Sequence, residues 1–150
     1  MKKLLTALAL IATMQANAQV FVGFGPGISS KGNVLGDLSL GYQYKNIVVQ
    51  AGYQSQLNSA EPLLLQLRGA VQLPLGNRFY VQPFAGYCRY QMSSDDKSRN
   101  SNSYVAGVEL LLFTLPDGAW FAGYTQTKQH TLFSCGLRYW FGGGPWKDFF

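Results

Sequence analysis

Four charged residues lie in segments that are otherwise apolar, small or amide-bearing, and they alternate between acid and base along the chain. The four are Asp37, Arg68, Glu109 and Arg138. Buried charges persist in proteins when each is paired with an opposite charge, and a carboxylate beside guanidiniums keeps its ionised form. Their order therefore predicts a structural charge network in which each carboxylate lies between two arginines. A catalytic acid and base pair is disfavoured, and a gate for water or small ions is the functional alternative.

Residue types that bind metals or perform catalysis are otherwise scarce. One histidine, His130, and two cysteines do not supply the ligand set of a metal centre. Gly23, Gly25 and Gly27 are spaced like part of a phosphate-binding loop, but no helical segment follows them. Glycines that make room for larger neighbours explain this spacing better. We therefore expect no catalytic residue, no metal and no cofactor.

The first eighteen residues have the pattern of a secretory signal peptide. Lys2 and Lys3 precede a short apolar stretch over residues 4–12, and Ala16-Asn17-Ala18 provides the small residues of a cleavage site. The apolar stretch is about half the ~20 residues that a membrane-spanning helix needs. Removal of residues 1–18 leaves a mature chain from Gln19 and lowers the formal charge from +5 to +3. Export and this modest charge give no reason to expect a nucleic-acid partner.

Eight segments of alternating apolar and polar residues follow, separated by turn-forming residues and without a helical period of useful length. This pattern predicts an all-β protein, an eight-stranded antiparallel up-and-down transmembrane barrel over residues 19–141. The expected strands span residues 19–28, 34–44, 47–56, 62–73, 78–90, 103–113, 119–127 and a last strand that ends at Phe141. Residues 78–90 are the least regular, because both faces carry aromatic residues and Pro83 lacks a backbone donor.

The two faces of these strands differ in charge. One face is apolar and aromatic, and Arg89, beside a long loop, is its only charged residue. The other face carries the four charges together with Gln50, Gln66 and Gln82. A soluble barrel of the streptavidin or lipocalin kind turns its apolar face inward, whereas a transmembrane barrel presents that face to lipid. The distribution favours the transmembrane alternative, in which the polar face lines a lumen filled by side chains.

The alternation also predicts the state of the two cysteines. Cys88 falls on an inward face and Cys135 on an outward face, and their strands are not adjacent. Although an oxidising compartment favours disulfides, these side chains are not placed to meet. We therefore expect two free thiols.

Connection lengths alternate along the chain. The connections after the second, fourth and sixth strands are tight turns, and those after the first, third and fifth are longer and more polar. Outer-membrane barrels have short periplasmic turns and longer external loops. The longest connection is therefore the candidate external loop, with Met92, Asp95, Asp96, Lys97 and Arg99 as its candidate contact residues.

The last strand carries a recognisable sequence signal. Ser134 and Gly136 alternate with Leu137, Tyr139 and Phe141, a pattern that resembles the C-terminal insertion signal of bacterial outer-membrane β-barrels. The whole mature chain resembles the small OmpX/OmpA-type barrels of Gram-negative bacteria. It departs from them in one place, because residues 142–150 follow Phe141 as a C-terminal tail. The resemblance implies an outer-membrane location, contact with outer-membrane lipid and lipopolysaccharide, and insertion by the barrel assembly machinery.

Two functions remain open. The first is a non-enzymatic barrel that presents loops to an extracellular protein or host ligand, or that supports envelope integrity. The second is a narrow, porin-like pore for water or small solutes. A lipid A-modifying enzyme is a further alternative, but His130 and Ser134 are four residues apart and do not match the His-x-Ser pattern of the barrel deacylases. His130 is therefore expected to be an exposed loop residue.

Overall fold

The computed structural model describes residues 18–56, 63–91, 101–128 and 130–141. Nearly all of the expected signal peptide, the candidate external loop and the C-terminal tail lie outside these residues. The strands are β1 (Ala18–Ser29), β2 (Val34–Tyr44), β3 (Ile47–Gln56), β4 (Leu63–Val71), β5 (Leu73–Pro74), β6 (Phe79–Gln91), β7 (Ser101–Leu115), β8 (Gly118–Thr127) and β9 (Thr131–Phe141). No helix in the described residues is long and apolar enough to cross a membrane.

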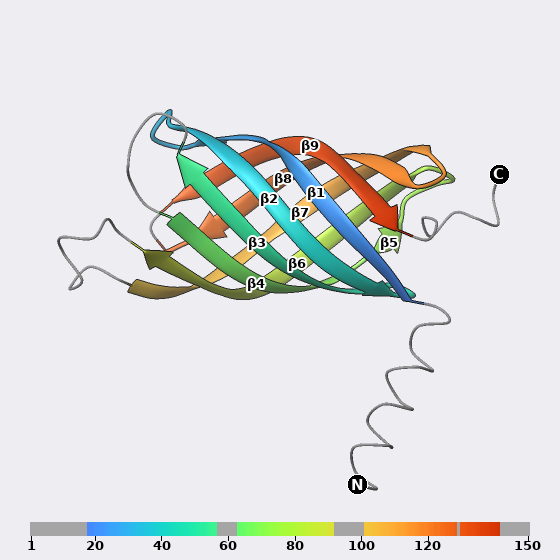
Figure 1. The fold of residues 1–150 in the computed structure, drawn as a ribbon, viewed down its shortest axis with the longest axis horizontal. Helices are drawn as coiled ribbons and strands as arrows, with labels where there is room; N and C mark the ends of the chain where they lie inside the picture. The colour runs from blue at the N-terminus through green and yellow to red at the C-terminus, as the bar shows by residue number, and fades with distance from the viewer. Residues whose placement is uncertain (1–17, 57–62, 92–100, 129, 142–150) are drawn as a thin grey trace, which may run out of the picture.

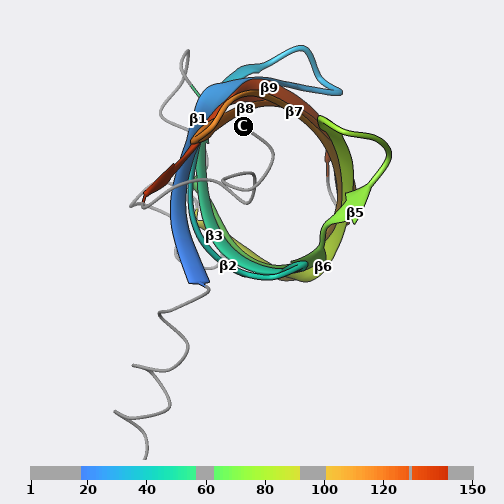
Figure 2. The same ribbon diagram turned by 90° about the vertical axis from the view of Figure 1, so that its right-hand side faces the viewer.

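All the strands belong to one antiparallel sheet that closes on itself. Consecutive strands pair with each other except β4 and β5, β1 also pairs with β9, and β4 pairs with β6. Viewed from one end, the strands form a ring (Figure 2). The expected eight-stranded closed barrel is therefore confirmed, and its strands run obliquely along the long axis (Figure 1).

The fourth strand differs from expectation, because the structure divides residues 62–73 into β4 and β5. The pairs Ala70 with Phe84 and Leu73 with Val81 belong to one continuous register, so the two elements are one pass across the barrel. The interruption lies beside Pro83, which has no backbone N–H to donate. The N–H of Gln72 instead donates to the carbonyl oxygen of Asn46, at 2.7 Å.

The barrel has two different ends. The short turns at residues 45–46, 75–78 and 116–117 lie at one end, which we call the turn end. The β1–β2 turn at residues 30–33 lies at the other end, which we call the mouth, together with Lys128 and His130 of the β8–β9 turn. Hydrogen bonds join these two turns to the strands around them, including one from the N–H of Ser30 to the carbonyl oxygen of Thr131, at 2.8 Å.

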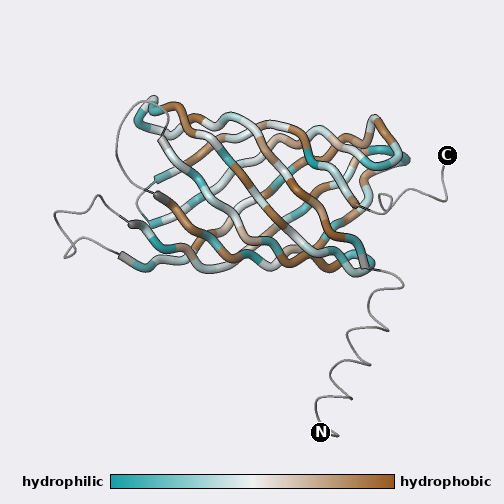
Figure 3. The backbone as a smooth tube through the Cα atoms, viewed as in Figure 1, coloured by the Kyte–Doolittle hydropathy of each residue, from teal (hydrophilic) through white to brown (hydrophobic). Residues whose placement is uncertain are grey.

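Side chains alternate between the outer surface and the lumen, as the sequence predicts. Outward positions are exposed and apolar, for example Leu40 at 58%, Leu67 at 60% and Phe133 at 57%. The four predicted inward charges are all buried. Apolar and polar residues consequently alternate along each strand (Figure 3). The molecule has an apolar exterior and a partly polar interior, the reverse of a soluble protein.

Glycine allows the first and last strands to approach closely where they close the barrel. A Cβ on Gly25 would lie 2.0 Å from the carbonyl oxygen of Cys135, and a Cβ on Gly136 would lie 2.1 Å from that of Phe24. Any other residue would clash with backbone here. Glycines at such points let a closed sheet bend more sharply than side chains would permit.

The alternation gives the two cysteines different reactivities. Both thiols are free, Cys88 is buried and Cys135 is exposed. We therefore predict that N-ethylmaleimide, without reductant, adds once to the folded barrel in detergent and twice after unfolding. Intact mass reads the number of adducts. A Cys135→Ser variant should take up none while folded, and an unfolded wild-type chain that takes up none would demonstrate a disulfide.

Candidate functional site

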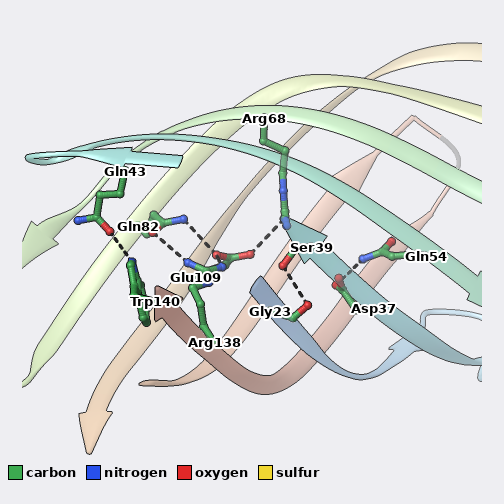
Figure 4. Close-up of polar contacts among 10 residues, drawn as sticks. All are labelled: Gly23, Asp37, Ser39, Gln43, Gln54, Arg68, Gln82, Glu109, Arg138 and Trp140. Atoms are coloured by element: carbon green, nitrogen blue, oxygen red, sulfur yellow. Dashed lines mark hydrogen bonds and ion pairs between the residues drawn. The ribbon is translucent and has the colours of Figure 1, made fainter. Parts of the chain in front are cut away.

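An ion triad of Arg68, Glu109 and Arg138 lies in the middle of the lumen. Arg68 Nη1 lies 3.1 Å from Glu109 Oε1, and Arg138 Nη2 lies 2.6 Å from Glu109 Oε2. The three residues come from β4, β7 and β9, and none is more than 3% exposed. Each carboxylate oxygen thus accepts from a different guanidinium (Figure 4). Ion pairs with such charge-assisted hydrogen bonds are among the strongest polar contacts in proteins.

Gln82 links two members of the triad. Its Nε2 donates to Glu109 Oε2 at 3.2 Å, and its Oε1 accepts from Arg138 Nη1 at 3.2 Å. The β6–β7 register places Gln82 directly opposite Glu109. A side-chain amide suits this position because it offers a donor and an acceptor together.

Aromatic rings cover the faces of the two guanidiniums. Arg138 Cζ lies 4.5 Å from the ring centre of Phe21 and 5.5 Å from that of Phe121. Arg68 Cζ lies 4.5 Å from the ring centre of Phe84. A planar guanidinium can stack on a ring and donate to a carboxylate in its own plane at the same time. This explains how two cations are held by one carboxylate in a buried setting.

Asp37 does not join the triad, which departs from the predicted ring of four alternating charges. Its Oδ2 accepts a hydrogen bond from Gln54 Nε2 at 2.7 Å, and no ion pair to it is found among the described residues. Gly23 pairs with both Arg138 and Ser39, whereas Asp37 pairs with Gly25. Ser39 is therefore the β2 residue at the level of Arg138, and Asp37 lies two residues nearer the mouth. Glu109 lies between two guanidiniums as predicted, and Asp37 does not.

An aromatic plug of Phe21, Phe113 and Trp140 fills the lumen at the turn end. The ring centre of Trp140 lies 5.4 Å from that of Phe21 and 5.0 Å from that of Phe113. Trp140 Nε1 donates to Gln43 Oε1 at 3.1 Å. A Cβ on Gly41 would lie 2.1 Å from the Phe21 ring, so a glycine on β2 makes room for the plug.

The predicted polar lumen did not include this aromatic plug. Phe21 shares the inward parity of Gly23, and Phe113 shares that of Glu109, so the alternation itself contained the signal. Together the plug and the triad occupy successive levels. In Figure 4 the labelled residues run in a row from Gln43 and Trp140 through the triad to Asp37 and Gln54.

His130 lies at the mouth and is partly buried, not exposed as expected. Its ring contacts Tyr90 edge-on, with ring centres 5.8 Å apart, and its backbone N–H donates to Thr127 Oγ1 at 3.0 Å. Burial, together with the charge of Lys31, lowers the pKa of His130. No hydrogen bond joins its ring to Ser134 in the described part of the chain. Within that part, no cluster of three or more His, Cys, Asp or Glu side chains could hold a metal ion.

The structure places the residues of the resembled insertion signal on opposite faces of β9. Ser134 and Gly136 point inward, whereas Tyr139 and Phe141 are exposed on the outer surface, and Leu137 is partly exposed there. The candidate loop residues Met92, Asp95, Asp96, Lys97 and Arg99 lie outside the described residues. Their contacts therefore remain predictions.

Comparison with known proteins finds similarity in fold. No protein-family model and no curated protein matches the sequence. The N-terminal β-barrel domain of Pseudomonas aeruginosa OprF matches with a TM-score of 0.68 and 13% identity, over 83% of this chain and 98% of that one. The Yersinia pestis outer-membrane protein Ail in a phospholipid nanodisc matches with a TM-score of 0.59 and 13% identity, over 83% and 99% of the chains.

A designed transmembrane β-barrel also matches, with a TM-score of 0.59 and 17% identity over 82% of this chain and 95% of the design. The fold is thus that of the small eight-stranded outer-membrane β-barrels. Because an invented sequence shares it, the fold assigns no activity by itself. Function has to be argued from the surface and the lumen of this chain.

The triad generates a prediction about stability. Glu109→Gln keeps the shape of the side chain but leaves two buried guanidiniums without their carboxylate, which should lower the free energy of unfolding by about 3–5 kcal/mol. Urea unfolding in lipid vesicles, followed by tryptophan fluorescence, measures it. Asp37→Asn is the matched control, because its carboxylate accepts from the Gln54 amide and forms no ion pair with the residues that the structure describes; this variant should lose clearly less unfolding free energy. An unchanged midpoint for Glu109→Gln would show that the triad does not stabilise the barrel.

Proposed function

We propose that this chain is an exported, non-enzymatic protein of the bacterial outer membrane, which acts through the surface at its mouth. The observation that carries the proposal is the inverted polarity of a closed barrel. Its outer surface exposes apolar residues, and the charges of its spanning strands are buried inside, except for Arg89 near the mouth end of β6. Each charge placed on a lipid-facing surface instead would cost about 2–4 kcal/mol for Arg, and less for an acid.

The proposal also includes export by a cleaved signal peptide, residues 1–18, and a barrel domain over residues 19–141. Residues 142–150 form a periplasmic tail in this arrangement. The turn end then faces the periplasm and the mouth faces the exterior, because short turns are typical of the periplasmic side. Lipopolysaccharide and other outer-membrane lipids surround the barrel, and the barrel assembly machinery inserts it.

The filled lumen favours a role in surface display over one in transport. The aromatic plug and the ion triad occupy successive levels, and Trp140, Phe113 and Arg138 are at most 1% exposed. An eight-stranded barrel encloses only enough room for its own side chains. A narrow pore would require these side chains to separate, at the cost of exposing buried charges. Contact with an extracellular protein or host ligand, or support of the envelope, therefore fits the chain better.

Planar-bilayer recording separates display from transport. We predict that the purified barrel gives no steady conductance at any applied voltage, because the plug and the triad block the lumen. A single N-ethylmaleimide adduct on the same sample, at exposed Cys135 and not at buried Cys88, checks that the protein is folded. Reproducible open steps in every preparation would establish a channel and refute the proposal.

The proposed insertion signal can be tested with a matched pair of variants. Phe141 is 54% exposed at the end of β9, and Phe79 is 55% exposed on β6. Each alanine substitution removes one outward phenyl ring, so both variants lose the same contact with membrane lipid. Phe141→Ala should reduce the amount of assembled barrel in outer-membrane fractions of a Gram-negative host, and Phe79→Ala should not. Equal amounts for both variants would remove the special role of the last strand.

A further inference from the structure

One cation stands on the outer face of the spanning strands, near the mouth end of β6. Arg89 is exposed, and the strand ends two residues later at Gln91. The ion pairs found among the described residues involve Arg68 and Arg138 and not Arg89. A guanidinium in hydrocarbon is costly, but the cost falls near the interface, where a long side chain reaches the headgroup layer. Arg89 therefore marks the headgroup level on this side of the barrel.

A second cation lies close to this level. Lys128 directly follows Thr127, which pairs with Val105, so it stands beside the position of Tyr104 on β7. It is exposed and shares the outward phase of Gln126. The spacing of strands and the rise along them place the backbones of Arg89 and Lys128 about 12 Å apart. Two long cationic side chains at this separation can reach one anion between them.

Two tyrosines and an amide lie between the cations. Tyr87 on β6 pairs with Tyr104 on β7, and these side chains are 56% and 63% exposed. Asn102 pairs with Arg89 and is also exposed. Tyrosine is typical of membrane interfaces, where its ring contacts hydrocarbon and its hydroxyl reaches the polar layer. The hydroxyls and the amide add neutral hydrogen-bond donors between the two charges.

We call these five residues, Tyr87, Arg89, Asn102, Tyr104 and Lys128, the rim patch. No described acid neutralises it. Of the three acids in the described residues, Asp37 and Glu109 are buried in the lumen, and Asp117 lies in a turn at the turn end. The adjoining residues 92–100 contain two acids and two bases and so add no net charge. The rim patch therefore favours an anionic partner.

Small residues continue the outer face below the rim patch. Ala85 lies two residues from Tyr87 toward the turn end and pairs with both Gly69 and Ala106. Gly69 and Ala85 are exposed, and Ala106 is partly exposed. Without bulky side chains at this level, a hydrocarbon chain can lie close to the sheet. A partner with an anionic head and an apolar chain thus meets complementary surfaces at both levels.

We propose that the rim patch binds the phosphate headgroup of an anionic membrane lipid, with Arg89 and Lys128 as its charge partners and an acyl chain along Ala85 and Ala106. A guanidinium suits this role because it can donate two parallel hydrogen bonds to one phosphate. The inference rests on the proposed outer-membrane location, because it requires an outer surface in contact with lipid. Absence from outer-membrane fractions would refute the location, whereas the micelle titration below tests the lipid site alone.

Two short-chain lipids that differ in their headgroups provide the test. The ¹⁵N-labelled barrel is placed in dihexanoyl-phosphatidylcholine micelles and titrated with dihexanoyl-phosphatidic acid, which changes the headgroup and keeps the chains. The Nε signal of Arg89 and the backbone amide signals of Asn102 and Lys128 should shift saturably. The amide signal of Lys45, at the turn end, should not. Equal saturable shifts at both ends, or shifts that only grow linearly, would show general attraction of anions to the barrel and overturn the site.

Substitutions that each remove one charge locate the site. Arg89→Gln and Lys128→Gln should each weaken phosphatidic acid binding by about fivefold, the effect expected for one cation near a lipid surface. Lys45→Gln is the matched control, because Lys45 is exposed at the opposite end and also lies beside a tyrosine, with Nζ 5.6 Å from the ring centre of Tyr44. Its affinity should equal that of the wild type. Equal affinities for Arg89→Gln and Lys45→Gln would refute the role of Arg89.

Inorganic phosphate distinguishes a lipid from a free anion. It carries the same charged group without acyl chains, so at equal concentration it should give no saturable shift of the Arg89 signal. A saturable shift with an affinity equal to that of phosphatidic acid would identify a soluble anion as the ligand and overturn the lipid site.

Discussion

Pairing of the first strand with the last is the constraint on which the rest of the structure depends. An open sheet edge presents unpaired N–H and C=O groups, which are costly in apolar surroundings. Here β1 pairs with β9 and β4 with β6, so each of the eight long strands is paired on both sides. Closure with eight strands leaves an interior only wide enough for side chains. Every inward residue must therefore find its partner across the lumen, and Glu109 finds two, on β4 and β9.

The interior meets this requirement by arranging different kinds of contact in levels. The aromatic plug needs only shape, the triad needs opposite charges, and the pair formed by Gln54 and Asp37 needs one donor and one acceptor. Across the described lumen, the four inward charges sum to zero, although the triad alone carries one excess positive charge. Asp37 therefore balances the total charge from a different level.

Alternation of residue types was enough to predict the strands, their phase and the burial of all four charges. It was not enough to predict which charges meet, because contact across a lumen depends on the stagger between strands. Ser39, not Asp37, pairs with the Gly23 that faces Arg138, and nothing in the local sequence reveals that offset. Phe21 and Phe113 had the correct parity but were overlooked, since the glutamines suggested a uniformly polar interior. To predict that Gln54 meets Asp37, one needs the register of the β2–β3 hairpin, which the short turn at Lys45 and Asn46 determines.

Pro83 has a consequence for how the barrel comes apart. The β4–β6 ladder is interrupted beside it, and the short β5 beyond the gap is paired at only two positions, Leu73 and Pro74. The Gln72 N–H is engaged by the β2–β3 turn and not by β6. Cooperative opening of hydrogen bonds stops where a ladder is broken. The β5–β6 pairing at the turn-end corner can therefore open separately from the longer β4–β6 ladder. The Leu73 amide hydrogen, the only one in β5 because Pro74 has none, will exchange with solvent before those of β4, and the barrel will begin to open at that corner.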